Sequence, residues 1–191
     1  MNARDNILAR LRAVKVANSE QPQIEAIKSI SFEDRIAYFA EVVRSVGGEV
    51  VEQNGSLEAT LATLLNEGVA LVSPLAELQG KALNPDEVAD VHELGGEYTA
   101  IVEGKVGVAE NGAVWVPVEG RRKAHLFACK HLVILLDKEC VVDTMHDAMK
   151  RVSLDKLAYG AFVSGPSKTA DIEQALVMGA HGAMKATVIL Y

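Results

Sequence analysis

A short segment near the end of the chain gathers residue types that bind anions. It directly follows the apolar run Ala161 to Val163 and combines a Gly-Pro turn with hydroxyls, one cation and carboxylates. Backbone N–H groups of such a turn can converge on an anion, and Ser, Thr and Lys side chains add donors suited to a phosphate or carboxylate. The alternative is structural, because Thr169 and Asp171 could simply cap a helix that starts there. The residues expected to bind a ligand are Ser164, Gly165, Pro166, Ser167, Lys168, Thr169, Asp171 and Gly182.

Two further side chains are candidates for catalysis. His181 lies in a Gly-rich loop before the apolar run Ala186 to Leu190, and it could transfer a proton or contact an oxyanion. Glu110 precedes the turn Asn111-Gly112, where a carboxylate could attack an acyl thioester. Each has a plainer interpretation, because a His in a Gly-rich loop and a Glu beside a hairpin turn are often ordinary surface residues.

No recognisable metal-binding or nucleotide-binding motif is present in the chain. Cys129 and Cys140 cannot supply four ligands to a zinc or iron–sulfur site, so we expect two small residues of a reduced protein. His125 and His131 lie close to Cys129 in the sequence but do not complete a zinc site. The basic cluster at 121–123 is either a solvated run or a clamp for an anionic substrate. We predict no metal and no cofactor.

Composition favours one α/β domain. The chain has 191 residues, 49% of them hydrophobic and 5% aromatic, so aliphatic side chains form the core. A formal charge of −7 argues against a nucleic-acid surface. The N-terminus lacks the apolar region of a secretory signal, and no run approaches the ~18 apolar residues of a membrane span. The sequence therefore predicts a cytoplasmic protein that has no membrane span and binds no nucleic acid.

Helices and strands alternate along most of the chain, with short joints marked by glycine. This rhythm predicts a largely parallel sheet flanked by helices, with the ligand at the carboxyl ends of the strands. Residues 1–20 are expected to form a helix and linker, and 21–191 a single α/β domain. The N-terminal helix either lies on its own domain or packs on another subunit of a homo-oligomer. The expected strands are 49–52, 69–72, 131–136, 161–163 and 186–190, and the expected helices start at Ser31, Leu57, Asn84 and Asp143. Asn111-Gly112 predicts a hairpin within 98–118.

The closing segment also carries a family resemblance. The run S-G-P-S-K-T-A-D-I-E at 164–173, followed by G-A-H-G at 179–182, resembles the C-terminal motif of the LUD domain family. Its best-known members are the lactate utilisation protein C group (LutC/YkgG-like), and the likeness extends from about residue 30 onward. The resemblance implies a fold like that of the NagB/RpiA/CoA-transferase superfamily. It also implies a part in oxidising L-lactate to pyruvate, beside a partner subunit that carries iron–sulfur clusters.

One segment departs from the family pattern. The family usually has a T-G-T-like turn where this chain has Glu110 to Ala113. The run A-E-N-G at 109–112 is similar to the S-E-N-G segment that holds the catalytic glutamate of CoA transferases. Two alternatives therefore remain. One is an acyl-CoA transferase with Glu110 as its nucleophile. The other is a non-catalytic subunit that assembles the iron–sulfur partner through the helix at 3–13.

Overall fold

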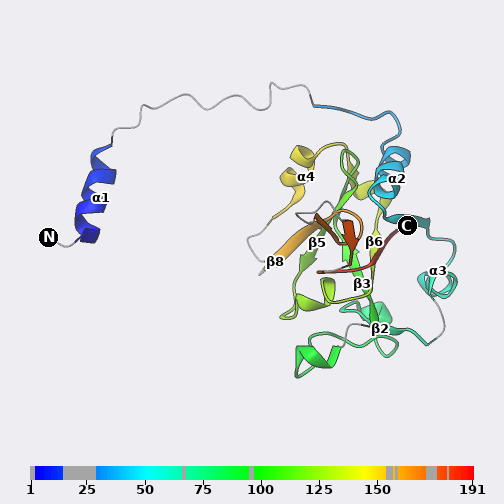
Figure 1. The fold of residues 1–191 in the computed structure, drawn as a ribbon. Helices are drawn as coiled ribbons and strands as arrows, with labels where there is room; N and C mark the ends of the chain where they lie inside the picture. The colour runs from blue at the N-terminus through cyan, green and yellow to red at the C-terminus, as the bar shows by residue number, and fades with distance from the viewer. Residues whose placement is uncertain are drawn as a thin grey trace.

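A five-stranded parallel sheet forms the centre of the protein (Figure 1). The computed structural model describes residues 3–14, 29–65, 68–94, 97–153, 157, 159–170, 176–179 and 181–191. The strands of this sheet are β1 (Glu49–Glu52), β2 (Ala70–Val72), β3 (Tyr98–Gly104), β6 (His131–Leu136) and β11 (Lys185–Leu190). Their order is β1-β11-β6-β3-β2, and every neighbouring pair is parallel. The predicted α/β class and its largely parallel sheet are confirmed.

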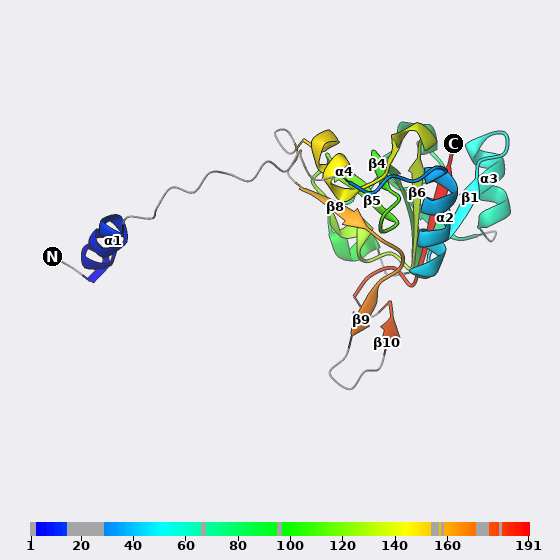
Figure 2. The ribbon, with the colours of Figure 1, turned by 90° about the horizontal axis from the view of Figure 1, so that it is seen from above.

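A second sheet of four strands lies beside the first and was not expected from the sequence. Its strands are β4 (Val106–Val108), β5 (Ala113–Val118), β7 (Val141–Val142) and β8 (Tyr159–Val163), in the order β7-β4-β5-β8. The predicted hairpin is confirmed, because β4 and β5 pair antiparallel across the Asn111-Gly112 turn, where Gly112 has a φ of 66°. Strands β9 (Lys168–Ala170) and β10 (Leu176–Met178) form a separate hairpin that projects from the body in Figure 2.

Four α-helices lie within the described residues, together with short 3-10 turns. The helices are α1 (Ala3–Ala13), α2 (Arg35–Ser45), α3 (Leu57–Leu64) and α4 (Met145–Arg151), and the 3-10 turns are η2 (Ala76–Leu78), η3 (Val91–Leu94), η4 (Ala124–Leu126) and η5 (Lys138–Cys140). Side-chain caps fix three of the helix starts. Asp34 accepts a hydrogen bond from the N–H of Ala37 at 2.9 Å, so the N-cap of α2 is Asp34, three residues after the predicted Ser31. Thr144, rather than the predicted Asp143, caps α4.

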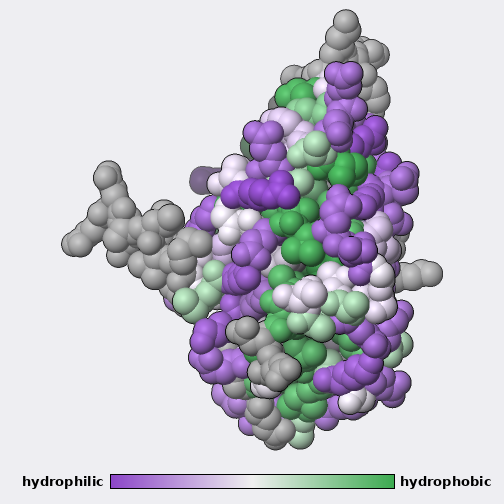
Figure 3. Space-filling view, turned by 90° about the vertical axis from the view of Figure 1, so that its right-hand side faces the viewer, coloured by the Kyte–Doolittle hydropathy of each residue, from purple (hydrophilic) through white to green (hydrophobic). Residues whose placement is uncertain are grey.

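The buried hydrophobic side chains form three clusters, because successive side chains along a strand point to opposite faces of the sheet. Even-numbered residues of β6 join a cluster with Phe39 and Val43 of α2 and with the inner face of the second sheet. Odd-numbered residues of β6 face Leu61 of α3 instead. A third cluster packs the outer face of the second sheet against Ala148 of α4. On the side of the molecule that carries α2 and α3, Figure 3 shows an apolar band between hydrophilic borders.

The helix predicted at Asn84 is wrong, and the error has a local cause. Asn84 does not begin a helix, because its Oδ1 accepts from the N–H of Asp86 at 3.0 Å and the chain turns there instead. Lys168–Ala170 forms strand β9, and the alternative of a helix capped by Asp171 falls on 171–175, which lies outside the described residues. Helix α1 buries none of its residues. Residues 15–28 are also outside the described part, so the predicted boundary at residue 20 stays a prediction.

Candidate functional site

The Gly-Pro turn lies at a junction of three other segments. The hydroxyl of Ser164 donates to the carbonyl of Asn111 at 2.9 Å, which joins the turn to the β4–β5 hairpin. The N–H of Ser167 donates to the carbonyl of Ala183 at 2.8 Å, just before β11. Gly165 has a φ of 67°, and a Cβ there would lie 2.7 Å from the carbonyl oxygen of Val46, so only glycine fits against the end of α2.

The two parts of the predicted site do meet, although most of their polar groups are used in packing. A Cβ added to Gly182 would lie 3.0 Å from Cβ of Ser167, so the Gly-rich loop touches the turn. Pro166 is buried, and the hydroxyl of Ser164 is already engaged. These contacts hold the junction together, and the ligand-binding roles of Ser164, Gly165, Pro166 and Gly182 stay predictions.

Three side chains of the predicted site remain available. The Ser167 hydroxyl, the Lys168 ammonium group and the His181 imidazole make no hydrogen bond or ion pair with another described side chain or backbone group, and Lys168 and His181 are exposed. Lys168 pairs with Met178 across the β9–β10 hairpin, and the N–H of Gly179 donates to the carbonyl of Ser167 at 2.9 Å. These contacts hold the loop that carries His181 beside the turn. The Ser167 side chain lies against Gly182, and the Lys168 side chain runs past Gly47, where an added Cβ would lie 3.7 Å from Lys168 Cε. The position of the Thr169 side chain is not among those described.

The predicted position at the carboxyl edge of the sheet is wrong for this turn. Residues 181–184 precede β11, and the N–H of Met184 donates to the carbonyl of Lys130, which precedes β6. The turn therefore lies at the amino edge of the five-stranded sheet. It follows the carboxyl end of β8 alone, and β8 belongs to the second sheet. An apolar run of this length looks the same in sequence whichever sheet receives it.

Glu110 has a structural partner in this arrangement. Its Oε2 accepts from the N–H of Met145 at 2.9 Å, at the first turn of α4. Its own N–H donates to the carbonyl of Asp143 at 3.0 Å. The carboxylate is exposed and links the β4–β5 turn to α4, as a helix-capping acid does. Its role as a covalent nucleophile stays a prediction.

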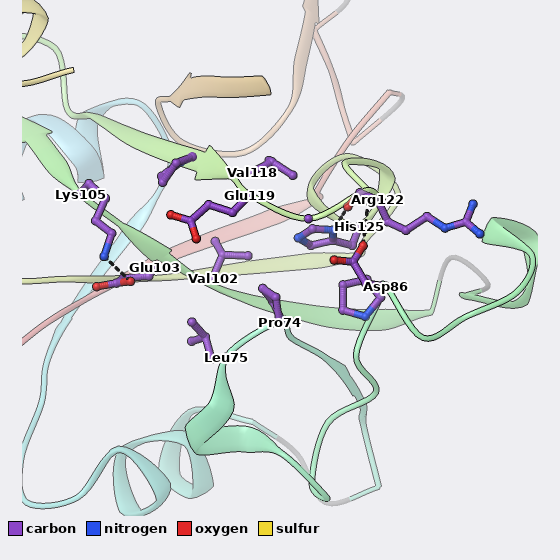
Figure 4. A pocket seen from close by; sticks show the side chains of 13 residues that line it. Pro74, Leu75, Asp86, Val102, Glu103, Lys105, Val118, Glu119, Arg122 and His125 are labelled. Atoms are coloured by element: carbon purple, nitrogen blue, oxygen red, sulfur yellow. Dashed lines mark hydrogen bonds and ion pairs between the residues drawn. The ribbon is translucent and has the colours of Figure 1, made fainter. Parts of the chain in front are cut away.

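A cavity that sequence analysis missed lies beside the second half of β3. Its volume is about 210 Å³. It forms because β2 has three residues and pairs only with the first part of the seven-residue β3, so the loops after β2 and β5 cover the remaining edge. Figure 4 shows these lining side chains, which include Asp86, Glu103, Lys105, Glu119 and His125.

His125 is the buried polar group of this cavity. It is 3% exposed, and its Nδ1 lies 2.5 Å from the carbonyl oxygen of Arg122. Burial lowers the pKa of His125, with the Arg122 carbonyl and the Asp86 charge acting in the opposite direction. The N–H of Arg122 in turn donates to Oδ1 of Asp86 at 3.0 Å, which joins the loop after β5 to the loop after β2. No periodic pattern predicts this contact, since Asp86 and Arg122 are 36 residues apart in the chain.

His131 is a second buried histidine, and it lies between strands near the amino edge. Its Nε2 is 2.8 Å from Oγ1 of Thr187, and that hydroxyl donates to Glu49 at 3.4 Å. Lys185 forms an ion pair with Glu49 at 3.0 Å. Burial, together with the nearby Lys185 charge, lowers the pKa of His131 to about 4. This group therefore connects three strands as a neutral imidazole.

The described residues contain neither a metal cluster nor a membrane-spanning helix. No group of three or more His, Cys, Asp and Glu side chains in them is placed to hold a metal ion. No helix in the same part of the chain is long and apolar enough to cross a membrane.

Known proteins resemble this chain in sequence and in fold. A family model described as the LUD domain matches residues 92–191. Lactate utilization protein C of Bacillus pumilus (strain SAFR-032) is 28% identical over 186 residues, covering 94% of this chain and 72% of that protein. The crystal structure of a DUF162 family protein from Deinococcus radiodurans, at 1.70 Å resolution, superposes with a TM-score of 0.64 and 13% identity. It covers 85% of this chain and 99% of that chain, and at this identity it shows the fold alone.

Proposed function

The chain belongs to the LUD domain family, and on that premise we propose that it is a component of a system that oxidises L-lactate to pyruvate. The observation that carries this proposal is the likeness to lactate utilization protein C along nearly the whole chain. That relative is named for lactate utilisation, and the likeness includes the α/β body as well as the closing segment.

We also propose that a small anionic ligand binds at the Gly-Pro turn, with its carboxylate against the unpaired polar groups of Ser167, Lys168 and His181. Lys168 supplies a positive charge, and the Ser167 hydroxyl and the His181 imidazole supply hydrogen-bond donors at short sequence distance. Charge-assisted hydrogen bonds to a carboxylate are stronger than neutral ones, so Lys168 should dominate affinity. The chain is acidic as a whole, with a formal charge of −7. A lysine without an ion-pair partner among the described residues can still attract an anion locally at this turn.

Oxidation of L-lactate to pyruvate releases two electrons and two protons, and we propose that a partner subunit accepts the electrons. The family resemblance supports a partner subunit with iron–sulfur clusters. Helix α1 is the segment we expect to contact it, because α1 exposes Ile7 and Leu11 by 60% and 64%. Such exposed apolar side chains on a short helix are typical of an interaction surface.

Growth and binding measurements test the two parts of this proposal separately. A strain that lacks this protein should fail to grow on L-lactate, and the wild-type chain should restore growth. Lys168→Ala should not restore it, while Lys150→Ala, which removes an exposed lysine of α4, should. Normal growth of the deletion strain would refute the role in lactate utilisation. Restored growth with Lys168→Ala would instead refute only the site.

Calorimetry gives a direct measure of the site. Purified wild-type protein and Lys150→Ala should bind L-lactate with equal affinity, and Lys168→Ala should bind about tenfold more weakly, because one charge-assisted contact is lost. The thermal unfolding temperature of Lys168→Ala should stay at the wild-type value, since this side chain is exposed. Equal affinity of all three proteins would contradict the assignment of Lys168.

A further inference from the structure

The cavity beside the second half of β3 presents hydrogen-bond acceptors and few donors. Glu119 makes no hydrogen bond with another described residue, and Asp86 uses only Oδ1. The charge of Glu103 is compensated by Lys105, whose Nζ lies 2.5 Å away. The guanidinium group of Arg122 points away from the cavity in Figure 4 and donates outward to backbone carbonyls. Neither the Asp86 nor the Glu119 carboxylate forms an ion pair with another described residue, although Arg121 donates to the backbone carbonyl of Asp86 at 3.1 Å.

His125 adds a third acceptor, and the hydrogen bond it already makes decides which atom that is. A backbone carbonyl only accepts, so Nδ1 of His125 must carry the proton that it donates to Arg122. In the neutral imidazole the lone pair is then on Nε2. Figure 4 shows this second nitrogen on the side of the ring that faces the cavity, away from Arg122. Nε2 has no hydrogen-bond partner within the described part of the chain, and His125 is only 3% exposed.

The rest of the lining is apolar. Val102 and Val118 are 3% and 5% exposed and belong to the main core cluster, so their positions are fixed by packing. Pro74 and Pro117 also line the cavity. A ligand in this cavity would thus place an apolar part on rigid side chains and its polar end against the acceptors.

We propose that this cavity binds a small primary alkylammonium ion. Its three N–H groups match the three acceptors, namely the Glu119 carboxylate, Oδ2 of Asp86 and Nε2 of His125, and its alkyl chain lies on Val102 and Val118. Two carboxylates favour a cation and disfavour an anion. The site is therefore distinct in location and in charge preference from the Gly-Pro turn, and it does not depend on the function proposed above.

Nitrogen NMR of the histidine ring tests the proposal directly. The probe is n-butylammonium chloride, with sodium butyrate as the matched anion of similar size. The expected result is a saturable shift of the His125 Nε2 resonance away from its lone-pair position with butylammonium, and no saturable shift with butyrate. A spectrum that moves with neither compound, or equally with both, would overturn the proposal.

Two variants then separate direct contact from the general field of the protein. Glu119→Gln should weaken butylammonium binding at least about fivefold, because a charge-assisted hydrogen bond is lost. Glu87→Gln removes one exposed carboxylate next to Asp86 that does not line the cavity, and its affinity should remain within about twofold of wild type. Equal weakening in both variants would mean that butylammonium responds only to overall charge, and that result would refute the site. An unchanged thermal unfolding temperature of Glu119→Gln checks that the variant is folded.

Discussion

Replacing His131 by glutamine should remove a specific part of the pH dependence of folding. The side chain is 9% exposed, and burial and Lys185 lower its pKa from the ordinary 6.5 to about 4. Between these two values the unfolded chain binds a proton that the folded chain does not, so the free energy of unfolding rises with pH in this window. The contribution is fully present above pH 6.5 and is lost as the pH falls toward 4.

The size of this effect follows from the shift itself. A pKa difference between 6.5 and about 4, at about 1.4 kcal/mol per unit, corresponds to about 3 kcal/mol at the acid end. Between pH 7.5 and 4.5 the loss should be about 2.5 kcal/mol, because protonation of the folded state is then only beginning. Glutamine at this position has no titrating group, yet its amide can still donate to Oγ1 of Thr187.

Urea unfolding at several pH values between 7.5 and 4.5 measures this contribution. Wild-type protein should lose about 2.5 kcal/mol more than His131→Gln over that range, even if the variant is less stable at neutral pH. His146→Gln, at an exposed position of α4, is the control and should follow the wild-type curve. Parallel curves for wild type and His131→Gln would show that the buried imidazole does not titrate as argued, and the reasoning from burial would fail.

Two further predictions concern the core and the thiols. Gly104→Ala should reduce the free energy of unfolding by about 2 kcal/mol, because the added Cβ would overlap Val114 Cγ1 and lie 2.9 Å from Ile134 Cγ2. Urea unfolding measures the loss, and a midpoint equal to that of the wild type would contradict the prediction. Burial raises the pKa of the Cys129 thiol to about 11, so at pH 8 a thiol reagent should label the partly exposed Cys140 first and Cys129 only after unfolding. Labelling of both thiols at one rate in the native protein would count against this order.

The strands with strong local signals could be predicted from sequence. The run at 131–136 is β6 to the residue, and Asn111-Gly112 forms the turn between β4 and β5. Both signals are local, since an unbroken apolar run predicts a buried strand and Asn-Gly supplies the backbone conformation of a tight turn. The helix expected at Asn84 failed for an equally local reason, because an asparagine side chain that caps a helix also stabilises an isolated turn.

The position of the candidate site could not be predicted in the same way. The Gly-Pro turn follows an apolar run, but the pairing of β8 with β5 puts it at the amino edge of the central sheet. That position depends on which strand pairs with β8. The hydrophobic periodicity of a strand does not show which distant strand it pairs with. The same argument applies to the cavity, whose walls include Asp86 and Glu119 from loops far apart in the chain.

The two buried histidines illustrate why residue type alone does not identify a site. His125 and His131 are six positions apart, both are largely buried, and burial lowers the pKa of each. In His131 the hydroxyl of Thr187 contacts Nε2, and that hydroxyl continues to Glu49, so the ring connects three strands. In His125 the backbone carbonyl of Arg122 takes Nδ1, which leaves Nε2 as an acceptor facing an open space. The first arrangement stabilises the fold. The second leaves Nε2 without a hydrogen-bond partner among the described residues, and that difference supports binding at the cavity.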